Sequence, residues 1–309
     1  MLYIDKSAHK QDGDEVIDDF LNTCCRTPNG RYQGIRYDKK RDDGTNPAFC
    51  SANGRSYRKR LVNILLDNQQ RRCCYCLRRL KINKVDGDDE LVTLEHIIPR
   101  GFEIGAPKLA YYQRCSIVDS TNVQLTDEFE ISAMQTLPPY PHKVAYNNIV
   151  ASCNGTFPNE LSSRGGKSRL CCNEARREED AYPVYFLPNI ADMVEYSSNG
   201  DINAKSGSGY ESEITKLISS VKLQCQSLLD IRQLWFELHR CNYREIYSCK
   251  TESEREYLFA RVLYMSPTID CERASQLHTK FMVQENWDTF MLYNVFYSIF
   301  CRLYPCSSN

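Results

Sequence analysis

The stretch Leu94-Glu95-His96-Ile97-Ile98-Pro99 places a carboxylate beside a histidine. Upstream, Cys73 and Cys76 form a Cys-x-x-Cys pair, and Cys153 and Cys172 follow downstream at a wider spacing. A short-spaced cysteine pair is typical of zinc sites. An imidazole that titrates near neutral pH, next to a carboxylate that can hold a metal, suits phosphodiester hydrolysis. The stretch therefore favours a metal-dependent hydrolase inside a zinc-stabilised frame.

Four thiolates complete the tetrahedron that structural zinc prefers. We expect Cys73, Cys76, Cys153 and Cys172 to be the ligands, and the sequence leaves Cys171 open as a replacement for Cys172. The wide second spacing requires an inserted loop, which is tolerable because closure entropy grows slowly with length. Such a zinc has no open coordination position, so its role is structural. The alternative is a set of free thiols without metal.

The composition indicates a globular protein with a real core. The chain has 309 residues, of which 42% are hydrophobic, enough for two or three domains. No apolar run reaches the ~20 residues of a membrane span. Residues 1–20 carry acidic side chains where a signal peptide would be apolar. With sixteen cysteines and no export signal, we expect reduced thiols in a soluble, cytoplasmic protein with no membrane partner.

Charge is distributed unevenly along a chain whose net charge is only -1. Residues 26–84 contain sixteen Lys or Arg and four Asp, so the remainder is acidic. This asymmetry predicts a basic face that neutralises phosphates and leads into the candidate site. The alternative is a solvated surface that pairs with acidic segments elsewhere.

Turn signals and hydrophobic periodicity divide the chain into four segments. Residues 1–69 form a basic segment, irregular to about residue 55 and then helical over 56–70. Residues 70–185 form a core with strands near 91–96 and 146–152 and a helix over 173–180. A Gly- and Ser-rich linker spans 186–210. Residues 211–309 are helical, and the periodicity predicts helices over 214–238, 254–265 and 287–303.

Residues 70–180 resemble the HNH endonucleases, whose fold is the ββα-metal fold. The family pattern runs Cys-x-x-Cys, Asp/Glu-His-Ile-Ile-Pro, Asn-Leu with a Cys five residues past the Asn, and Cys followed by His or Asn. The corresponding residues here are Cys73 to Cys76, Glu95 to Pro99, Asn148-Ile149 with Cys153, and Cys172-Asn173. The resemblance implies an α+β fold, namely a zinc-stabilised ββα-metal core with an irregular N-terminal segment and a helical C-terminal domain.

The resemblance also implies a role for each site residue. His96 is the expected general base, while Glu95 and Asn173 are the expected oxygen ligands of a catalytic Mg²⁺ or Mn²⁺. Because neighbouring residues of a strand face opposite sides, Glu95 and His96 should point apart. Asn148 is expected to hold the connecting loop and orient His96. The predicted nucleic-acid contacts are Arg100, Lys167, Arg176 and Arg177.

A narrower resemblance concerns the later part of the chain. The inserted loop and the region after it are similar to the HNH subunit of Septu and retron-associated anti-phage systems, through Glu195-Tyr196, Gly200-Asp201-Ile202, Leu223 to Leu228 and Arg232. The resemblance implies an effector that works beside an ATPase of the SMC/ABC type. The alternative is that residues 211–309 are simply a helical domain that packs on the core.

Three functions therefore compete. The first is a metal-dependent nuclease that acts on DNA, or on RNA such as tRNA. The second is a zinc-stabilised module that binds nucleic acid without cutting it, and the third is an interaction scaffold. Only the nuclease hypothesis predicts that His96→Ala abolishes activity while the fold, the bound zinc and nucleic-acid binding stay intact.

Overall fold

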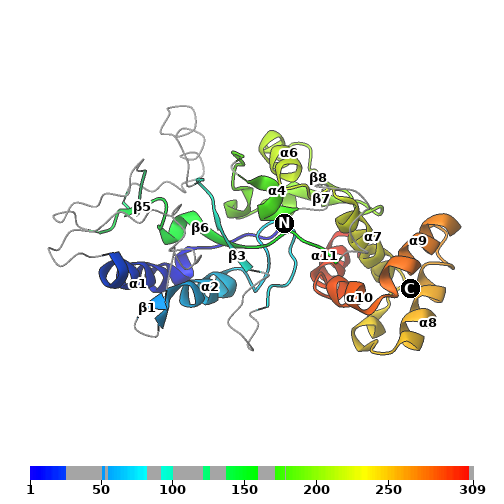
Figure 1. The fold of residues 1–309 in the computed structure, drawn as a ribbon. Coiled ribbons are helices and arrows are strands. Elements are labelled where there is room, and N and C mark those ends of the chain that lie inside the picture. The colour runs from blue at the N-terminus through cyan, green and yellow to red at the C-terminus, as the bar shows by residue number, and fades with distance from the viewer. Residues whose placement is uncertain are drawn as a thin grey trace.

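The computed structural model describes residues 1–25, 51–52, 55–81, 92–99, 121–125, 137–158, 171–177 and 179–305. Within these ranges the fold mixes helices with short strands that pair two by two. Figure 1 shows the N-terminal helices and the strand pair β3–β6 in one half of the molecule and helices α7 to α11 in the other. The expected mixed fold is confirmed at this level.

The central element is an antiparallel pair of strands. β3 (Val92–His96) pairs with β6 (Ile149–Cys153), so that His96 lies opposite Ile149. Every residue of β6 is buried, whereas burial along β3 varies. Strands were predicted at both places, but residues Tyr146–Asn148 form a 3-10 turn, η3, before β6 begins.

Two N-terminal helices pack beside this pair. α2 (Tyr57–Asn68) confirms the helix predicted over 56–70 and contacts β6. α1 (Lys10–Phe20), flanked by η1 (Ser7–His9) and the π-helical η2 (Leu21–Cys25), packs on α2. The irregular structure expected before residue 55 is therefore wrong for residues 1–25, because α1 buries an apolar face that includes Val16, Ile17 and Phe20.

Shorter elements complete this half. α4 (Cys172–Arg176) packs against β6, and it ends earlier than predicted, because the next residue, Arg177, has a φ of 52°. β1 (Ser51–Ala52) pairs with β2 (Arg55–Ser56). β4 (Val123–Gln124) pairs in parallel with β5 (Tyr140–Pro141).

The segment predicted as a linker is folded. Residues 186–210 contain the end of η5 (Val184–Phe186), α5 (Ile190–Met193), and the antiparallel strands β7 (Val194–Tyr196) and β8 (Ile202–Ala204). Gly200 forms the turn with a φ of 88°, and a Cβ there would lie 2.3 Å from the carbonyl oxygen of Leu229. The glycine therefore allows close packing against α7 and does not mark a flexible joint.

The C-terminal half is helical as predicted, with different boundaries. Its elements are α6 (Glu211–Ser220), α7 (Gln226–Arg240), η6 (Arg244–Ser248), α8 (Glu252–Val262), α9 (Cys271–Phe281), α10 (Gln284–Met291) and α11 (Val295–Leu303). The helices predicted over 214–238 and 287–303 are each two helices, and α9 was missed. Trp235 stacks on Phe290 with ring centroids 4.4 Å apart, which joins α7 to α10.

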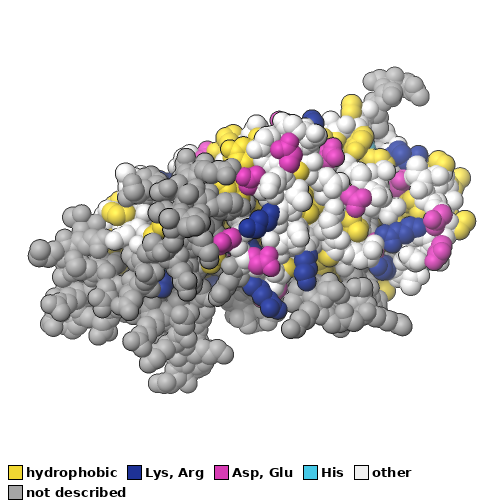
Figure 2. All heavy atoms as spheres, turned by 90° about the horizontal axis from the view of Figure 1, so that it is seen from above, with side chains coloured by type: hydrophobic (Ala, Val, Ile, Leu, Met, Phe, Trp, Pro, Cys, Tyr) yellow, Lys and Arg dark blue, Asp and Glu magenta, His cyan; other side chains and the backbone are white. Residues whose placement is uncertain are grey.

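On the face of the molecule in Figure 2, the basic and acidic side chains of the described residues are interspersed. The predicted basic segment, 26–84, falls partly outside the described residues, at 26–50, 53–54 and 82–84. Among the described residues, no helix combines the length and the apolar character required to cross a membrane.

Candidate functional site

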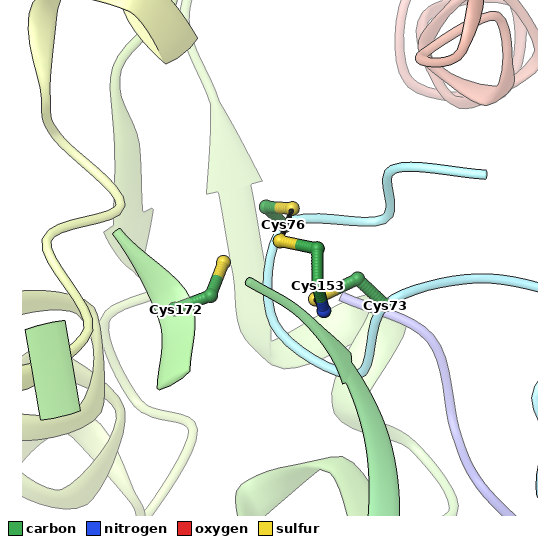
Figure 3. A group of neighbouring side chains, drawn as sticks. All are labelled: Cys73, Cys76, Cys153 and Cys172. Carbon is green, nitrogen blue, oxygen red and sulfur yellow. Dashed lines mark hydrogen bonds between the residues drawn. The ribbon is translucent and has the colours of Figure 1, made fainter. Parts of the chain in front are cut away.

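The four predicted zinc ligands come together. The sulfur atoms of Cys73, Cys76, Cys153 and Cys172 all lie within 4.8 Å of one another, and all four residues are buried (Figure 3). Sulfurs held about 2.3 Å from a central zinc would lie about 3.8 Å apart. The Sγ atoms of Cys76 and Cys153 are 3.7 Å apart. The cluster therefore fits a closed, four-thiolate metal site such as structural zinc.

Local backbone geometry aims these sulfurs at one point. The amide of Leu77 donates to the carbonyl oxygen of Cys73 at 3.2 Å, and the amide of Cys73 donates to that of Arg78 at 2.8 Å. Leu77 takes a φ of 66°, a position that usually favours glycine. The amide of Cys153 also donates to the Cys73 sulfur at 3.3 Å, a contact that favours a thiolate.

The structure selects Cys172 over Cys171. Cys172 is the first residue of α4 and belongs to the four-sulfur group, whereas Cys171 does not. The Cys171 sulfur is nevertheless buried and lies 3.4 Å from that of Cys172. The ligand set thus links the end of β6 to the start of α4.

Electrostatics within the cluster favour ionisation of some thiols. Burial would raise the pKa of Cys76, but hydrogen bonds from Cys153, Cys171 and Cys172 lower it to about 5. Burial, with hydrogen bonds to neighbouring cysteines, raises the pKa of Cys172 well above its ordinary value. Several thiolates this close together would repel one another. A bound dication would offset that repulsion and deprotonate the thiols that coordinate it.

The helical half contacts the metal cluster directly, a relationship that no sequence pattern indicated. The hydroxyl of Tyr293, between α10 and α11, lies 3.7 Å from the Cys76 sulfur. The amide of Arg79 donates to the carbonyl oxygen of Leu292 at 2.8 Å. A zinc ion at this place would therefore support the junction between the two halves as well as the core.

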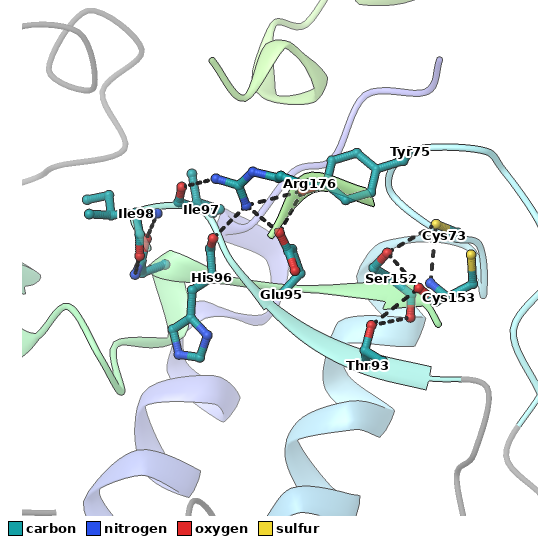
Figure 4. Close-up of polar contacts among 11 residues, drawn as sticks. Cys73, Tyr75, Thr93, Glu95, His96, Ile97, Ile98, Ser152, Cys153 and Arg176 are labelled. Atoms are coloured by element: carbon teal, nitrogen blue, oxygen red, sulfur yellow. Dashed lines mark hydrogen bonds and ion pairs between the residues drawn. The ribbon is translucent and has the colours of Figure 1, made fainter. Parts of the chain in front are cut away.

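Glu95 and His96 lie at the end of β3 with different surroundings. Figure 4 shows the Glu95 carboxylate facing Arg176 and the His96 ring directed away from it. The His96 Nε2 lies 2.9 Å from the carbonyl oxygen of Lys143. Because a carbonyl oxygen only accepts, Nε2 carries the proton, and Nδ1 is the basic nitrogen of the neutral ring. The contact therefore assigns the Nε2–H tautomer to the neutral His96 ring.

Arg176 lies in the interior, contrary to the phosphate contact predicted for it. The residue is 1% exposed, and its guanidinium forms an ion pair with Glu95. It also donates to the carbonyl oxygens of His96 at 2.7 Å and Ile97 at 2.6 Å. Burial raises the pKa of Glu95, and the charge of Arg176 opposes that rise. The side chain thus fixes the end of β3 to α4.

Sequence reasoning also missed Tyr75, which lies inside the Cys-x-x-Cys turn. Its hydroxyl donates to Oε1 of Glu95 at 3.1 Å, and the residue is buried. The turn between Cys73 and Cys76 and the Glu95 carboxylate are therefore in direct contact. An aromatic residue between two zinc ligands was the only signal in the sequence, and it does not specify a partner.

Asn148 holds the chain immediately after β3. Its Oδ1 accepts from the amide of Ile98 at 2.8 Å, and its Nδ2 donates to the carbonyl oxygens of Ile98 at 3.1 Å and His142 at 2.7 Å. The residue is fully buried. These contacts make Asn148 a positioning residue for the His96 segment.

The remaining predicted residues differ in location. Asn173 is partly exposed on α4, three residues before the buried Arg176. Arg177 is exposed at the end of α4 and remains a predicted phosphate contact. Arg100 and Lys167 lie outside the described residues.

Comparison with known proteins does not assign the chain to a family. No family model matches it, and no curated protein matches it significantly.

Proposed function

We propose that this chain is a metal-dependent endonuclease of the HNH, ββα-metal type, which hydrolyses phosphodiester bonds in nucleic acid, with DNA as the favoured substrate. The supporting observation is the antiparallel pairing of β3 with β6 and the packing of α4 on β6. Glu95 and His96 lie on β3, Asn173 lies on α4, and the four cysteines link the end of β6 to the start of α4.

Oxygen donors at this place suit Mg²⁺ or Mn²⁺. Both hydrogen bonds of Glu95 involve Oε1, and within the described residues none involves Oε2. Asn173 on α4 would supply an amide oxygen as the second ligand. The ion, when bound, would stabilise charge on the phosphate and on the leaving oxygen.

The protein's own groups then prepare the attack. His96 accepts a proton from water at Nδ1, while the Lys143 carbonyl oxygen holds the Nε2 proton and favours the resulting imidazolium. Asn148 and Arg176 fix the backbone of His96 and the two residues after it, which would supply the pre-organisation that general-base catalysis requires.

Cleavage of supercoiled plasmid by the zinc-loaded protein tests this proposal. With Mg²⁺ or Mn²⁺ the protein should nick the plasmid, whereas EDTA or His96→Ala should reduce cleavage by about 10²-fold or more. His278→Ala on α9 is the matched control, because His278 pairs with Glu256 far along the chain. Cleavage that survives in a folded His96→Ala protein would reject the proposed base.

The alternative is a zinc-stabilised nucleic-acid-binding or interaction module without catalysis. The observation in its favour is that Arg176 already neutralises the carboxylate intended for the metal. It predicts retarded migration of plasmid or RNA that is unchanged in His96→Ala, with no metal-dependent cleavage of DNA or tRNA.

We also propose that the chain acts as the effector subunit of an anti-phage complex with an SMC/ABC-type ATPase. Large apolar side chains are exposed on and just after α8, at Tyr257, Tyr264 and Met265. Such positions are candidates for a protein interface. Tyr264→Ser with Met265→Ser should weaken co-purification with the ATPase without changing the melting temperature. Unchanged co-purification would place the interface elsewhere.

A further inference from the structure

A cysteine and a histidine form a pair in the helical half, outside the four-sulfur cluster. The Cys301 sulfur on α11 lies 3.4 Å from Nδ1 of His239 on α7. These two helices pack together (Figure 1), and the rings of Phe236 and Phe300 meet between them with centroids 5.3 Å apart. The pair therefore lies on a fixed contact between two helices, and neither residue belongs to the proposed zinc ligands.

The backbone determines which nitrogen of His239 accepts a hydrogen bond. Nε2 lies 2.8 Å from the carbonyl oxygen of Tyr304, which can only accept, so Nε2 carries a proton. In the neutral ring Nδ1 is then the acceptor, and the Cys301 thiol is the donor of the contact between them. A nucleophile, a base and a group that orients the base therefore lie in a row, which is the pattern of an activated thiol.

The two residues differ in exposure and in local field. His239 is 4% exposed, whereas Cys301 is exposed, so a solute can reach the sulfur while the imidazole lies inside. His239 lies in the last turn of α7, where the backbone carbonyl groups favour a positive charge. Cys301 lies in the last turn of α11, where the same groups disfavour a thiolate. Ionisation of this thiol near neutral pH therefore depends on the histidine.

The other ionisable groups around the pair are tyrosines and charged neighbours along the helices. The Tyr297 ring meets the His239 ring edge-on with centroids 5.9 Å apart, and the Tyr247 ring meets that of Tyr297 at the same distance. Burial raises the pKa of Tyr247, so its hydroxyl is neutral near pH 7. The charged neighbours are Arg240, which pairs with Glu237, and the exposed Arg302. Histidine is the residue type in this group that changes charge near neutral pH.

We propose that Cys301 is a thiol-modification site, at which the thiol activated by His239 exchanges with a small disulfide and forms a mixed disulfide. Nδ1 of His239 takes the Cys301 proton, and the thiolate attacks one sulfur of the reagent. A new S–S bond forms, the S–S bond of the reagent breaks, and the departing thiolate takes the proton from the imidazolium. One thiol and one disulfide thus yield one mixed disulfide and one thiol, so atoms and electrons balance.

The site rests on the contact between His239 and Cys301, so its test is independent of nuclease activity. The intact zinc-loaded protein is incubated with glutathione disulfide, and mass spectrometry of tryptic peptides follows the modification of each cysteine with time. Dithiothreitol should remove the group from Cys301.

The pH dependence of the rate separates an activated thiol from an ordinary one. A thiol with the ordinary cysteine pKa gains about 30-fold in thiolate between about pH 7 and about pH 9.5. Because His239 accepts the proton at the lower pH, we expect the rate at Cys301 to rise by less than about 10-fold over this interval. A larger rise, or no modification of Cys301, would overturn the proposal.

His239→Gln tests the base. Glutamine can keep a hydrogen bond to the Tyr304 carbonyl oxygen but cannot take the thiol proton. The folded variant should react at Cys301 about 10-fold more slowly at about pH 7 and at a similar rate at about pH 9.5, a difference that altered packing alone would not produce. Cys271, exposed on α9, should react equally in both proteins.

His278→Gln is the matched control, because His278 lies on α9 and pairs with Glu256. It should leave the rate at Cys301 unchanged at both pH values. An unchanged rate at Cys301 in folded His239→Gln protein would show that exposure alone governs this thiol and would also overturn the proposal. If His239→Gln does not fold, the pH profile of the parent protein decides.

Discussion

Arg176 on α4 and Glu95 on β3 form a buried ion pair, although 81 positions separate them in the sequence. The same guanidinium donates to two backbone carbonyl oxygens beside the pair. One side chain therefore neutralises the predicted metal ligand and anchors the strand that carries the predicted base. This relationship makes the helix, the strand and the carboxylate a single unit.

Arg176→Met should destabilise the protein by about 3–5 kcal/mol, because it leaves a buried carboxylate without its counter-charge. The pKa of Glu95 is already raised above its ordinary value, and loss of Arg176 would raise it more. A raised folded-state pKa means that stability is retained below the unfolded pKa and lost as pH rises through the folded one. Urea unfolding should therefore show the variant recovering stability at acidic pH.

The double variant Glu95→Gln/Arg176→Met tests whether the unpaired Glu95 carboxylate causes the loss of stability. It removes both charges, so it should lose less stability than Arg176→Met alone and show little of the acidic recovery. Equal losses in the single and double variants would assign the effect of Arg176 to its backbone hydrogen bonds.

Asn148→Ala should impair catalysis more than binding. The substitution removes three hydrogen bonds and leaves buried backbone groups of Ile98 and His142 without that partner, at a cost of about 1–3 kcal/mol. The His96 segment would then be less well placed, so kcat for plasmid cleavage should fall with little change in plasmid affinity. A folded variant with unchanged kcat would remove Asn148 from the positioning residues.

Cys172→Ser should lose zinc and lower the melting temperature by about 10 °C or more, since structural zinc contributes several kcal/mol. Cys171→Ser is the matched control because the neighbouring sulfur lies outside the four-sulfur group. Zinc content and thermal unfolding measure the outcome. Full zinc content in Cys172→Ser together with loss in Cys171→Ser would reverse the ligand assignment.

The buried Lys6 side chain should make the free energy of unfolding increase with pH in the alkaline range. Its Nζ donates to the carbonyl oxygen of Ile149 at 2.6 Å and lies 3.7 Å from the centre of the Tyr146 ring. Burial lowers the pKa of Lys6 well below 10.5, so the unfolded chain binds more protons between the two pKa values, and stability increases with pH there. Lys6→Met should flatten this rise in unfolding measurements, whereas Lys59→Met, at an exposed lysine, should preserve it.

Local patterns in the sequence were sufficient for several elements. The period of apolar residues predicted α2, and residues 91–96 were predicted as a short strand, which is β3. The spacing of Cys73 and Cys76, with two later cysteines, predicted the four-sulfur cluster. The helix, the strand and the Cys73–Cys76 pair could be predicted because helical periodicity, β-forming residue types and short ligand spacings are properties of neighbouring residues.

The sequence by itself therefore determined which residue types are available for metal binding and proton transfer, and where their strands and cysteine turn begin. Only the tertiary structure decided that Arg176 is internal, that Cys172 and not Cys171 joins the cluster, and that residues 186–210 are folded. It also decided that the Tyr293 hydroxyl contacts the sulfur of Cys76. The physical reason is that burial and charge pairing depend on contacts between distant segments, which spacing along the chain does not specify.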